Sequence, residues 1–214
     1  MQGTKAVVDE NCYPGLRRVY GPNVRDARDT AGIQAVLVGA FPFWEQYPRS
    51  HREQFEAALS VVLRKPDRAK SRVRLAVKPR PGADTASWYE RYGQLDELIP
   101  ETTPLSQVFA TTDLAILIDE PSAAAFEAIS NGCAVVAVSR DPDAARWSDR
   151  PPDRGQLFDL ETMPVVHPDE FWDWMLAQDE RSVRAMWSRQ ADWLRSQLLA
   201  GVVVETFVPA TSTR

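Results

Sequence analysis

One stretch in the middle of the chain constrains the fold more than any other. It reads "LAILIDEPSAAAFEAISNGCAVVAV" over residues 114–138. Its two ends are apolar runs too short for helices, which is typical of strands covered on both faces. Between them, "AAAFEAIS" is rich in strong helix formers, and Asn131-Gly132 supplies a left-handed stop for a helix. The stretch therefore predicts a strand, a helix and a second strand parallel to the first.

The same alternation extends from this stretch back to Ile33. Apolar runs bounded by proline, glycine and polar residues alternate with amphipathic segments at helical spacing. This pattern predicts an α/β protein with a Rossmann-like, doubly wound parallel sheet and helices on both faces. The expected strands lie at 33–39, 72–77, 114–119 and 134–138, and the expected helices at 51–64, 87–92, 104–110, 123–130, 168–178 and 181–199.

The chain divides into three segments by pattern. Residues 1–32 contain one weak strand candidate, "KAVV", and several turn signals, so we expect a lead-in segment. Residues 33–166 hold the predicted domain of Rossmann-like fold. Residues 167–214 are expected to add helices that pack on it, and the tryptophans in them are interpreted as packing against the sheet or a partner.

Charge and cysteine content exclude several classes of protein. The net charge of −5 over 214 residues argues against a general nucleic-acid binder. Two cysteines provide neither a disulfide framework nor zinc-ligand spacing, so we expect no metal, and Cys133 is interpreted as a small buried residue. Because the chain has no signal peptide and no apolar run near transmembrane length, we expect a cytoplasmic protein, with peripheral membrane contact left open.

Candidate ligand-binding residues follow two predicted strands. "KPRPG" places Lys78 and Arg80 on a loop stiffened by Pro79 and Pro81. Residues 64–80 contain eight Lys or Arg and one acid in a chain that is acidic overall. Two interpretations are open: a solvated basic edge, or a site for the phosphates of a nucleotide.

The second candidate group opens the helix of the central stretch. Ser122 stands at the expected N-cap, and Glu127 shares a helix face with Ala123 and Ala124. Capping alone would explain Ser122, and Glu127 alone would be an exposed carboxylate. Together they leave a methyl-lined face that ends in a carboxylate, beside a helix N-terminus that favours phosphate. A carboxylate is the usual partner of a ribose hydroxyl pair in nucleotide sites.

These motifs resemble the carboxyl-terminal half of glycosyltransferases of the two-Rossmann-domain (GT-B) architecture, and are most similar to bacterial capsule and surface-polysaccharide enzymes of the sialyl- and Kdo-transferase type. That family has a Lys-x-His-Pro loop, an aspartate-led strand, a Ser-Ser helix start and a Glu-Ala pair five residues before a glycine. Arg80 replaces the histidine of the family and Ala123 its second serine. The matching positions are Lys78, Arg80, Pro81, Asp113, Ser122, Ala123, Glu127-Ala128 and Gly132.

The resemblance implies a donor domain that binds a nucleotide-activated sugar for surface polysaccharide or glycan synthesis. Lys78, Arg80 and Pro81 would form the phosphate-facing loop, Ser122 and Ala123 the helix start, and Glu127 the ribose contact. No catalytic residue is assigned, because the acceptor domain of such enzymes normally supplies the base; Asp119 and Glu120 are the speculative candidates within this chain. We expect the nucleotide sugar to be the substrate, without a further cofactor, and an acceptor domain to come from another protein or a second chain.

Two other functions stay open at this point. One is a non-catalytic binding or assembly module with a degenerate glycosyltransferase fold, favoured by Ala123 and Arg80. The other is half of a nucleotide-sugar epimerase, which shares the fold. The literal His-Pro at His167-Pro168 is a separate signal, and we interpret it as the start of a helix.

Overall fold

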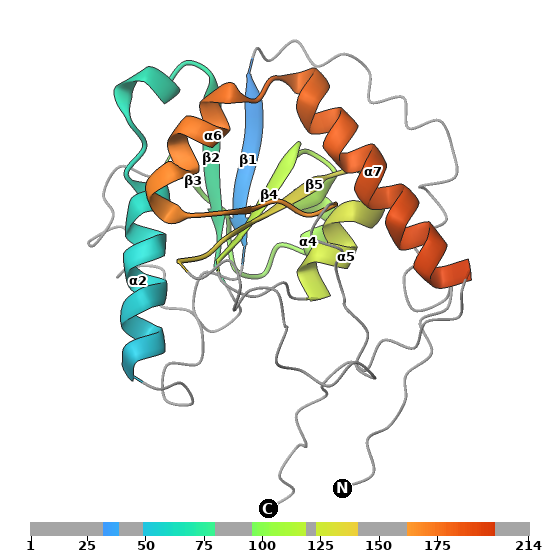
Figure 1. Cartoon of the computed structure of the whole chain (residues 1–214), viewed down its shortest axis with the longest axis horizontal. Helices are drawn as coiled ribbons and strands as arrows, with labels where there is room; N and C mark the ends of the chain where they lie inside the picture. The colour runs from blue at the N-terminus through green and yellow to red at the C-terminus, as the bar shows by residue number, and fades with distance from the viewer. Residues whose placement is uncertain (1–31, 39–48, 80–95, 119–122, 141–161, 200–214) are drawn as a thin grey trace, which may run out of the picture.

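The fold is built around a six-stranded, entirely parallel sheet in the order β3-β2-β1-β4-β5-β6. The computed structural model describes residues 32–38, 49–79, 96–118, 123–140 and 162–199, of which 49–52, 123 and 197–199 by their backbone alone (Figure 1). The strands are β1 (Ile33–Val38), β2 (Val73–Lys78), β3 (Glu97–Leu98), β4 (Leu114–Ile118), β5 (Ala134–Val138) and β6 (Val165–Val166).

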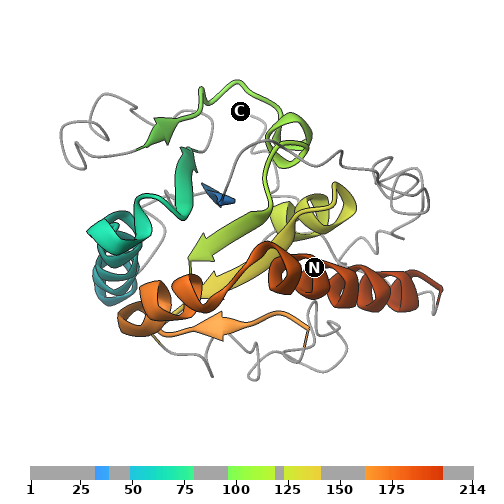
Figure 2. The same cartoon turned by 90° about the horizontal axis from the view of Figure 1, so that it is seen from above.

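Helices cover both faces of this sheet. In Figure 2, α2 and α6 lie on one side of the strands, and α4, α5 and the second half of α7 lie on the other. The helices are α2 (Arg49–Leu63), α4 (Leu105–Phe109), α5 (Ala123–Ser130), α6 (Phe171–Ala177) and α7 (Glu180–Leu199), with 3₁₀ turns η2 (Asp67–Ala69) and η5 (Pro168–Glu170).

The strands divide their side chains between two hydrophobic cores. Along β4, Leu114, Ile116 and Ile118 enter the core under α2 and α6, whereas Ala115 and Leu117 enter the core under α4 and α5. All five are buried because both faces of a parallel sheet are covered by helices. This is why the strand was recognisable as a continuous apolar run rather than as an alternating one.

The α5 helix ends where the sequence predicted it to end. Gly132 has a φ of +83°, and its N–H donates to the carbonyl of Ile129 at 3.1 Å. The N–H of Cys133 donates to the carbonyl of Ala128 at 2.9 Å. These two bonds form a Schellman motif, which satisfies carbonyls that the helix leaves unpaired and redirects the chain into β5.

Side chains complete the hydrogen bonding of the sheet beyond its strand pairs. The Asp113 carboxylate accepts the Gln34 N–H of β1 at 2.9 Å, and the Asp96 carboxylate accepts the Leu75 N–H of β2 at 2.8 Å. Each aspartate directly precedes a strand and pairs with the strand beside it. Buried backbone groups need such partners, because an unpaired N–H in the interior costs free energy.

The predicted α/β class and Rossmann-like parallel sheet are confirmed. The strands and helices expected at 33–39, 72–77, 114–119, 134–138, 51–64, 104–110, 123–130 and 181–199 are present within a few residues. The element expected over 168–178 begins as a 3₁₀ turn and continues as α6, with the His167 ring accepting the Asp169 N–H at 3.3 Å. The strand candidate "KAVV" and the helix expected at 87–92 lie outside the described residues.

Candidate functional site

The strand order marks one edge of the sheet as the candidate site. The chain runs outward from β1 to β2 and β3, and then returns to place β4, β5 and β6 on the other side. Strand order therefore reverses between β1 and β4. In open parallel sheets, ligands bind beyond the carboxyl ends of the strands at such a reversal. The end of β2 and the start of α5 are described parts of this edge.

Lys78 is the last residue of β2 and is held by backbone carbonyls. Its ammonium donates to the carbonyl oxygens of Pro79 at 3.0 Å and Glu101 at 2.7 Å, and the residue is only 3% exposed. Burial lowers the pKa of the Lys78 ammonium, and the negative charge of Glu101 partly opposes that shift. An ammonium has three hydrogens, and these two bonds use two of them.

Glu127 faces a neighbouring helix rather than open solvent. It is partly buried on α5, and its carboxylate accepts the backbone N–H of Ser106 in the first turn of α4. Burial raises the pKa of the Glu127 carboxyl, whereas the bond from Ser106 works in the opposite direction. The carboxylate thus satisfies a backbone N–H that helix α4 cannot pair internally.

Lys78 and Glu127 act on the same connection between β3 and α4. Lys78 binds it at the Glu101 carbonyl, and Glu127 binds the start of α4 at the Ser106 N–H. The structure therefore brings two predicted site residues to the two ends of a single segment. Sequence reasoning did not find Glu101 or Ser106, because both contribute backbone atoms, whose role does not depend on residue type.

The remaining predicted site residues are not all within the described part of the chain. Arg80, Pro81 and Ser122 lie outside it, together with the speculative Asp119 and Glu120. Ala123 is described as the first residue of α5, by its backbone alone. Ala125, Phe126 and Ile129 are buried in the core as expected for the other face of this helix.

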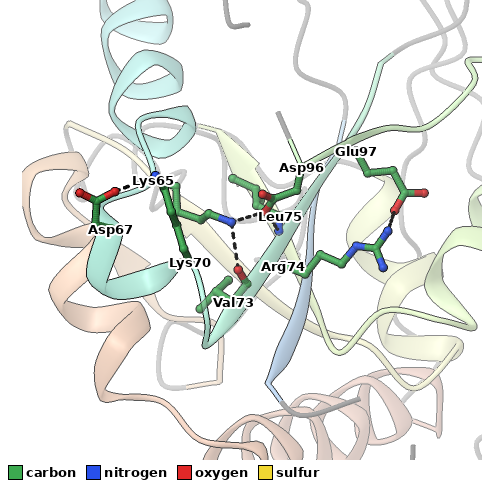
Figure 3. Close-up of polar contacts among 8 residues, drawn as sticks. All are labelled: Lys65, Asp67, Lys70, Val73, Arg74, Leu75, Asp96 and Glu97. Atoms are coloured by element: carbon green, nitrogen blue, oxygen red, sulfur yellow. Dashed lines mark hydrogen bonds and ion pairs between the residues drawn. The ribbon is translucent and has the colours of Figure 1, made fainter. Parts of the chain in front are cut away.

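Most of the basic residues at 64–80 lie away from the carboxyl edge and are paired. Lys65, which follows α2, donates to the Val73 carbonyl at 3.2 Å and forms an ion pair with Asp96 (Figure 3). Outside this partly buried contact the pairs are exposed, and they fit the interpretation of a solvated basic edge. They are Lys70 with Asp67 at 2.7 Å, Arg74 with Glu97 at 2.8 Å, and Arg68 with Asp173.

The amino edge of the sheet contains an open hollow of about 440 Å³. Gly32, Arg72, Met175, Gln178 and Arg181 are among its lining residues. This hollow is at the opposite end of the strands from Lys78.

The tryptophans of the last helices pack inside the fold. The Trp172 indole donates to the Val61 carbonyl of α2 at 3.0 Å, and the Trp187 indole donates to the Ile129 carbonyl of α5 at 2.9 Å. Each ring buries apolar area while its N–H is paired, as expected for interior tryptophan. Cys133 is fully buried, as predicted.

Metal-ligand clusters and membrane-spanning helices are both absent from the described ranges. These ranges contain no group of three or more His, Cys, Asp or Glu side chains placed to hold a metal ion. None of the helices in these ranges combines the length and apolarity needed to cross a membrane.

Several solved structures are similar to the chain at low identity. The spinosyn rhamnosyltransferase SpnG, complexed with spinosyn aglycone, is 16% identical with a TM-score of 0.46, over 84% of this chain and 45% of that one. A UDP-forming α,α-trehalose-phosphate synthase from Burkholderia vietnamiensis is 14% identical with a TM-score of 0.46, over 93% of this chain and 47% of that one. The apo structure of OtsA is 11% identical with a TM-score of 0.49, over 95% of this chain and 51% of that one.

The chain therefore spans about half the length of these solved structures. No protein-family model matches it, and no curated protein matches its sequence.

Proposed function

We propose that the chain binds a nucleotide-activated sugar as the donor half of a glycosyltransferase for surface polysaccharide or glycan synthesis. The observation that supports this proposal is the reversal of strand order between β1 and β4, because ligands of open parallel sheets bind beyond the carboxyl ends of the strands at such a reversal. The choice of glycosyl transfer rests on the motif resemblance between Lys78 and Gly132. Transfer would then require an acceptor domain from another protein or a second chain.

Phosphate recognition would use the amino end of α5. This eight-residue helix starts soon after β4 ends, so its unpaired N–H groups and partial positive charge belong to the carboxyl edge of the sheet. Ser122 would add a hydroxyl donor. Lys78 would contribute its remaining hydrogen and its charge, and Arg80 a second cation, to stabilise the departing phosphate.

Ribose recognition would use Glu127. A carboxylate has two oxygens and about four acceptor positions, so the bond from Ser106 leaves capacity for a ribose hydroxyl pair. Its placement one turn into α5 sets the ribose about 6 Å along the helix axis from the phosphate-binding end. The bond to Ser106 would at the same time hold the carboxylate in one orientation.

The direct test is a melting-temperature series with CMP, UDP, GDP and their sugars. A ligand at a hundred times its dissociation constant stabilises the native state by about 2.7 kcal/mol. We expect one nucleotide to raise the melting temperature in this way. Glu127→Gln should weaken that nucleotide about tenfold to a hundredfold, the loss of a hydrogen bond to a charged group. Glu180→Gln, at the amino edge, is the matched control and should bind as the parent does.

A binding or assembly module is the second candidate. The observation that favours it is that both Lys78 and Glu127 already bind backbone groups of the protein itself. In that case both residues would stabilise the fold, and no nucleotide would raise the melting temperature. Equal binding by the parent and Glu127→Gln would remove the proposed ribose contact.

A further inference from the structure

Helix α7 presents an arginine-rich face to solvent. Its inner face is buried through Val183, Met186, Gln190, Ala191 and Leu194. Helix α7 lies at the outside of the fold (Figures 1 and 2), and its opposite face is exposed between Arg181 and Asp192. We call Arg181, Arg184 and Arg189, with the small residues Ala185 and Ser188 between them, the α7 basic face.

The three arginines of the α7 basic face form no hydrogen bond or ion pair with the described residues, although the charge of Arg181 interacts with the nearby Asp179 carboxylate. Several basic residues elsewhere in the described ranges are paired with acids, such as Arg74 with Glu97 at 2.8 Å. Asp192 is the only acid that follows on the exposed side, and it pairs with Arg195 at 3.6 Å. The charges of Arg184 and Arg189 are therefore unpaired within the described residues, and that of Arg181 is partly balanced by Asp179.

The α7 basic face is opposite in charge to the rest of the chain, which is acidic. Helix α7 contains four arginines and two acids, which gives +2, so the rest of the chain carries −5 − 2 = −7. The helix has 20 residues, or about 30 Å of length, and the three arginines span about 12 Å of it. Arg72 is exposed and lines the same hollow as Arg181, which extends the positive surface to the amino edge of the sheet.

We propose that the α7 basic face docks on an anionic lipid bilayer. A flat anionic surface can meet an exposed helix without meeting the acidic remainder of the chain, whereas a polyanion that wraps around the molecule would meet both. Stable protein interfaces need a buried aromatic or aliphatic centre, and the α7 basic face has only Ala185 and Ser188 between its arginines. Each basic side chain near an anionic bilayer contributes about a fivefold gain in partitioning.

Docking in this way would leave the proposed nucleotide site accessible. The α7 basic face begins beside Gly32 and Arg72, at the amino ends of the strands, whereas Lys78 is at a carboxyl end. The inference does not depend on which nucleotide binds, or on whether one does.

Cosedimentation with lipid vesicles tests the proposal. The full chain is mixed with vesicles of phosphatidylcholine alone or with about one third phosphatidylglycerol. We expect binding to the anionic vesicles only, and loss of it at high salt because screening is stronger. The triple variant Arg181→Gln/Arg184→Gln/Arg189→Gln should partition about a hundredfold less.

The control is a second triple variant with the same change in net charge. Arg68→Gln/Lys70→Gln/Arg74→Gln removes exposed cations that are already paired, and it should keep most of the binding. Melting curves confirm that both variants are folded. The proposal is overturned if the parent does not bind anionic vesicles, if it binds neutral ones equally, or if both variants lose binding alike. Binding to poly-glutamate without binding to vesicles would assign the face to an acidic protein and overturn it as well.

Discussion

At the start of β1, a single glycine meets two demands at once. Gly32 has a φ of +104°, and a Cβ at this position would lie 2.7 Å from the carbonyl oxygen of Arg72. That carbonyl is not free to move, because it accepts the Ile33 N–H at 2.9 Å. Both backbone conformation and close approach therefore require glycine here.

Gly32→Ala should accordingly destabilise the protein. We expect a loss of about 1–3 kcal/mol in the free energy of unfolding, measured by urea titration, from the strained backbone conformation alone. Ser71→Ala, in the exposed turn beside it, is the control and should change stability by less than about 0.5 kcal/mol. An alanine variant as stable as the parent would show that β1 can begin without this close contact.

The environment of Glu127 predicts how the stability of the protein depends on pH. Burial raises the pKa of its carboxyl in the folded state. The folded protein thus retains a proton that the unfolded chain has released, so this contribution to stability is complete below roughly pH 4.3 and is lost as pH rises through the folded-state pKa.

Glu127→Gln should therefore gain stability relative to the parent as the pH rises from acid to neutral, since glutamine can still accept the Ser106 N–H but does not ionise. The measurement is the free energy of unfolding of both proteins across this range. Glu53→Gln, an exposed position on α2, provides the comparison. A parallel pH dependence for Glu127→Gln and the parent would contradict the raised pKa.

At the scale of elements, α7 is joined to the sheet by one buried amide. Gln190 is fully buried; its side-chain oxygen accepts the Val135 N–H at 2.8 Å, and its nitrogen donates to the carbonyls of Val135 at 2.7 Å and Thr162 at 3.0 Å. Strand β6 pairs with β5 only at Ala137 and Val138. The glutamine therefore supplies, from a helix, the pairing that a longer β6 would have given Val135.

Replacing Gln190 with methionine should expose this dependence. The volume is similar, but the Val135 N–H would be buried without a partner, at a cost of about 1–3 kcal/mol. Gln178→Met is the matched control, because its amide donates to the Trp174 carbonyl in a partly exposed position. Urea unfolding measures both, and amide exchange at Val135 should accelerate only in Gln190→Met. Slow exchange in that variant would mean that another group pairs with the strand.

The elements were predictable because their signals are local. The apolar run at β4, the helix formers of α5 and the Asn131-Gly132 stop each depend on neighbours in sequence. The same local signals placed Lys78 at the end of a strand and Glu127 within a helix. Their partners were not predictable, because the carbonyl of Glu101 and the N–H of Ser106 reach them across the fold, and nothing in the sequence marks which backbone group is left unpaired.

The sequence alone also did not indicate which basic residues of 64–80 lie at the carboxyl edge of the sheet and which lie at the amino edge. The basic residues of 64–80 are close in sequence, yet the Lys65 ammonium contacts Val73 at the start of β2, whereas Lys78 ends that strand. A strand of six residues separates its two ends by about 17 Å, which is more than one Debye length at physiological salt. A run of like charges therefore does not make one site when a strand passes through it.

At the scale of the whole molecule, the proposed function separates donor binding from sugar transfer. The described strands contain one reversal of strand order, and the proposed nucleotide would bind beyond their carboxyl ends at that point. Transfer also needs an acceptor hydroxyl held against the sugar and a base to take its proton, and ordering these groups contributes several orders of magnitude in rate. In the family that the motifs resemble, those groups come from the other domain.

Under the proposed function, we expect the chain by itself to bind the nucleotide sugar without transferring the sugar. Incubated with the nucleotide sugar that raises its melting temperature, it should release sugar to water slowly, and an added acceptor glycan should not increase that rate. Supplying an acceptor-binding domain, as a separate polypeptide or fused to the amino terminus, should raise transfer above hydrolysis. A Glu127→Gln chain in the same mixture separates the two steps, since it should lose transfer in proportion to its weaker nucleotide binding. Transfer by the chain alone, well above the rate of hydrolysis, would mean that one Rossmann-like sheet already positions both substrates.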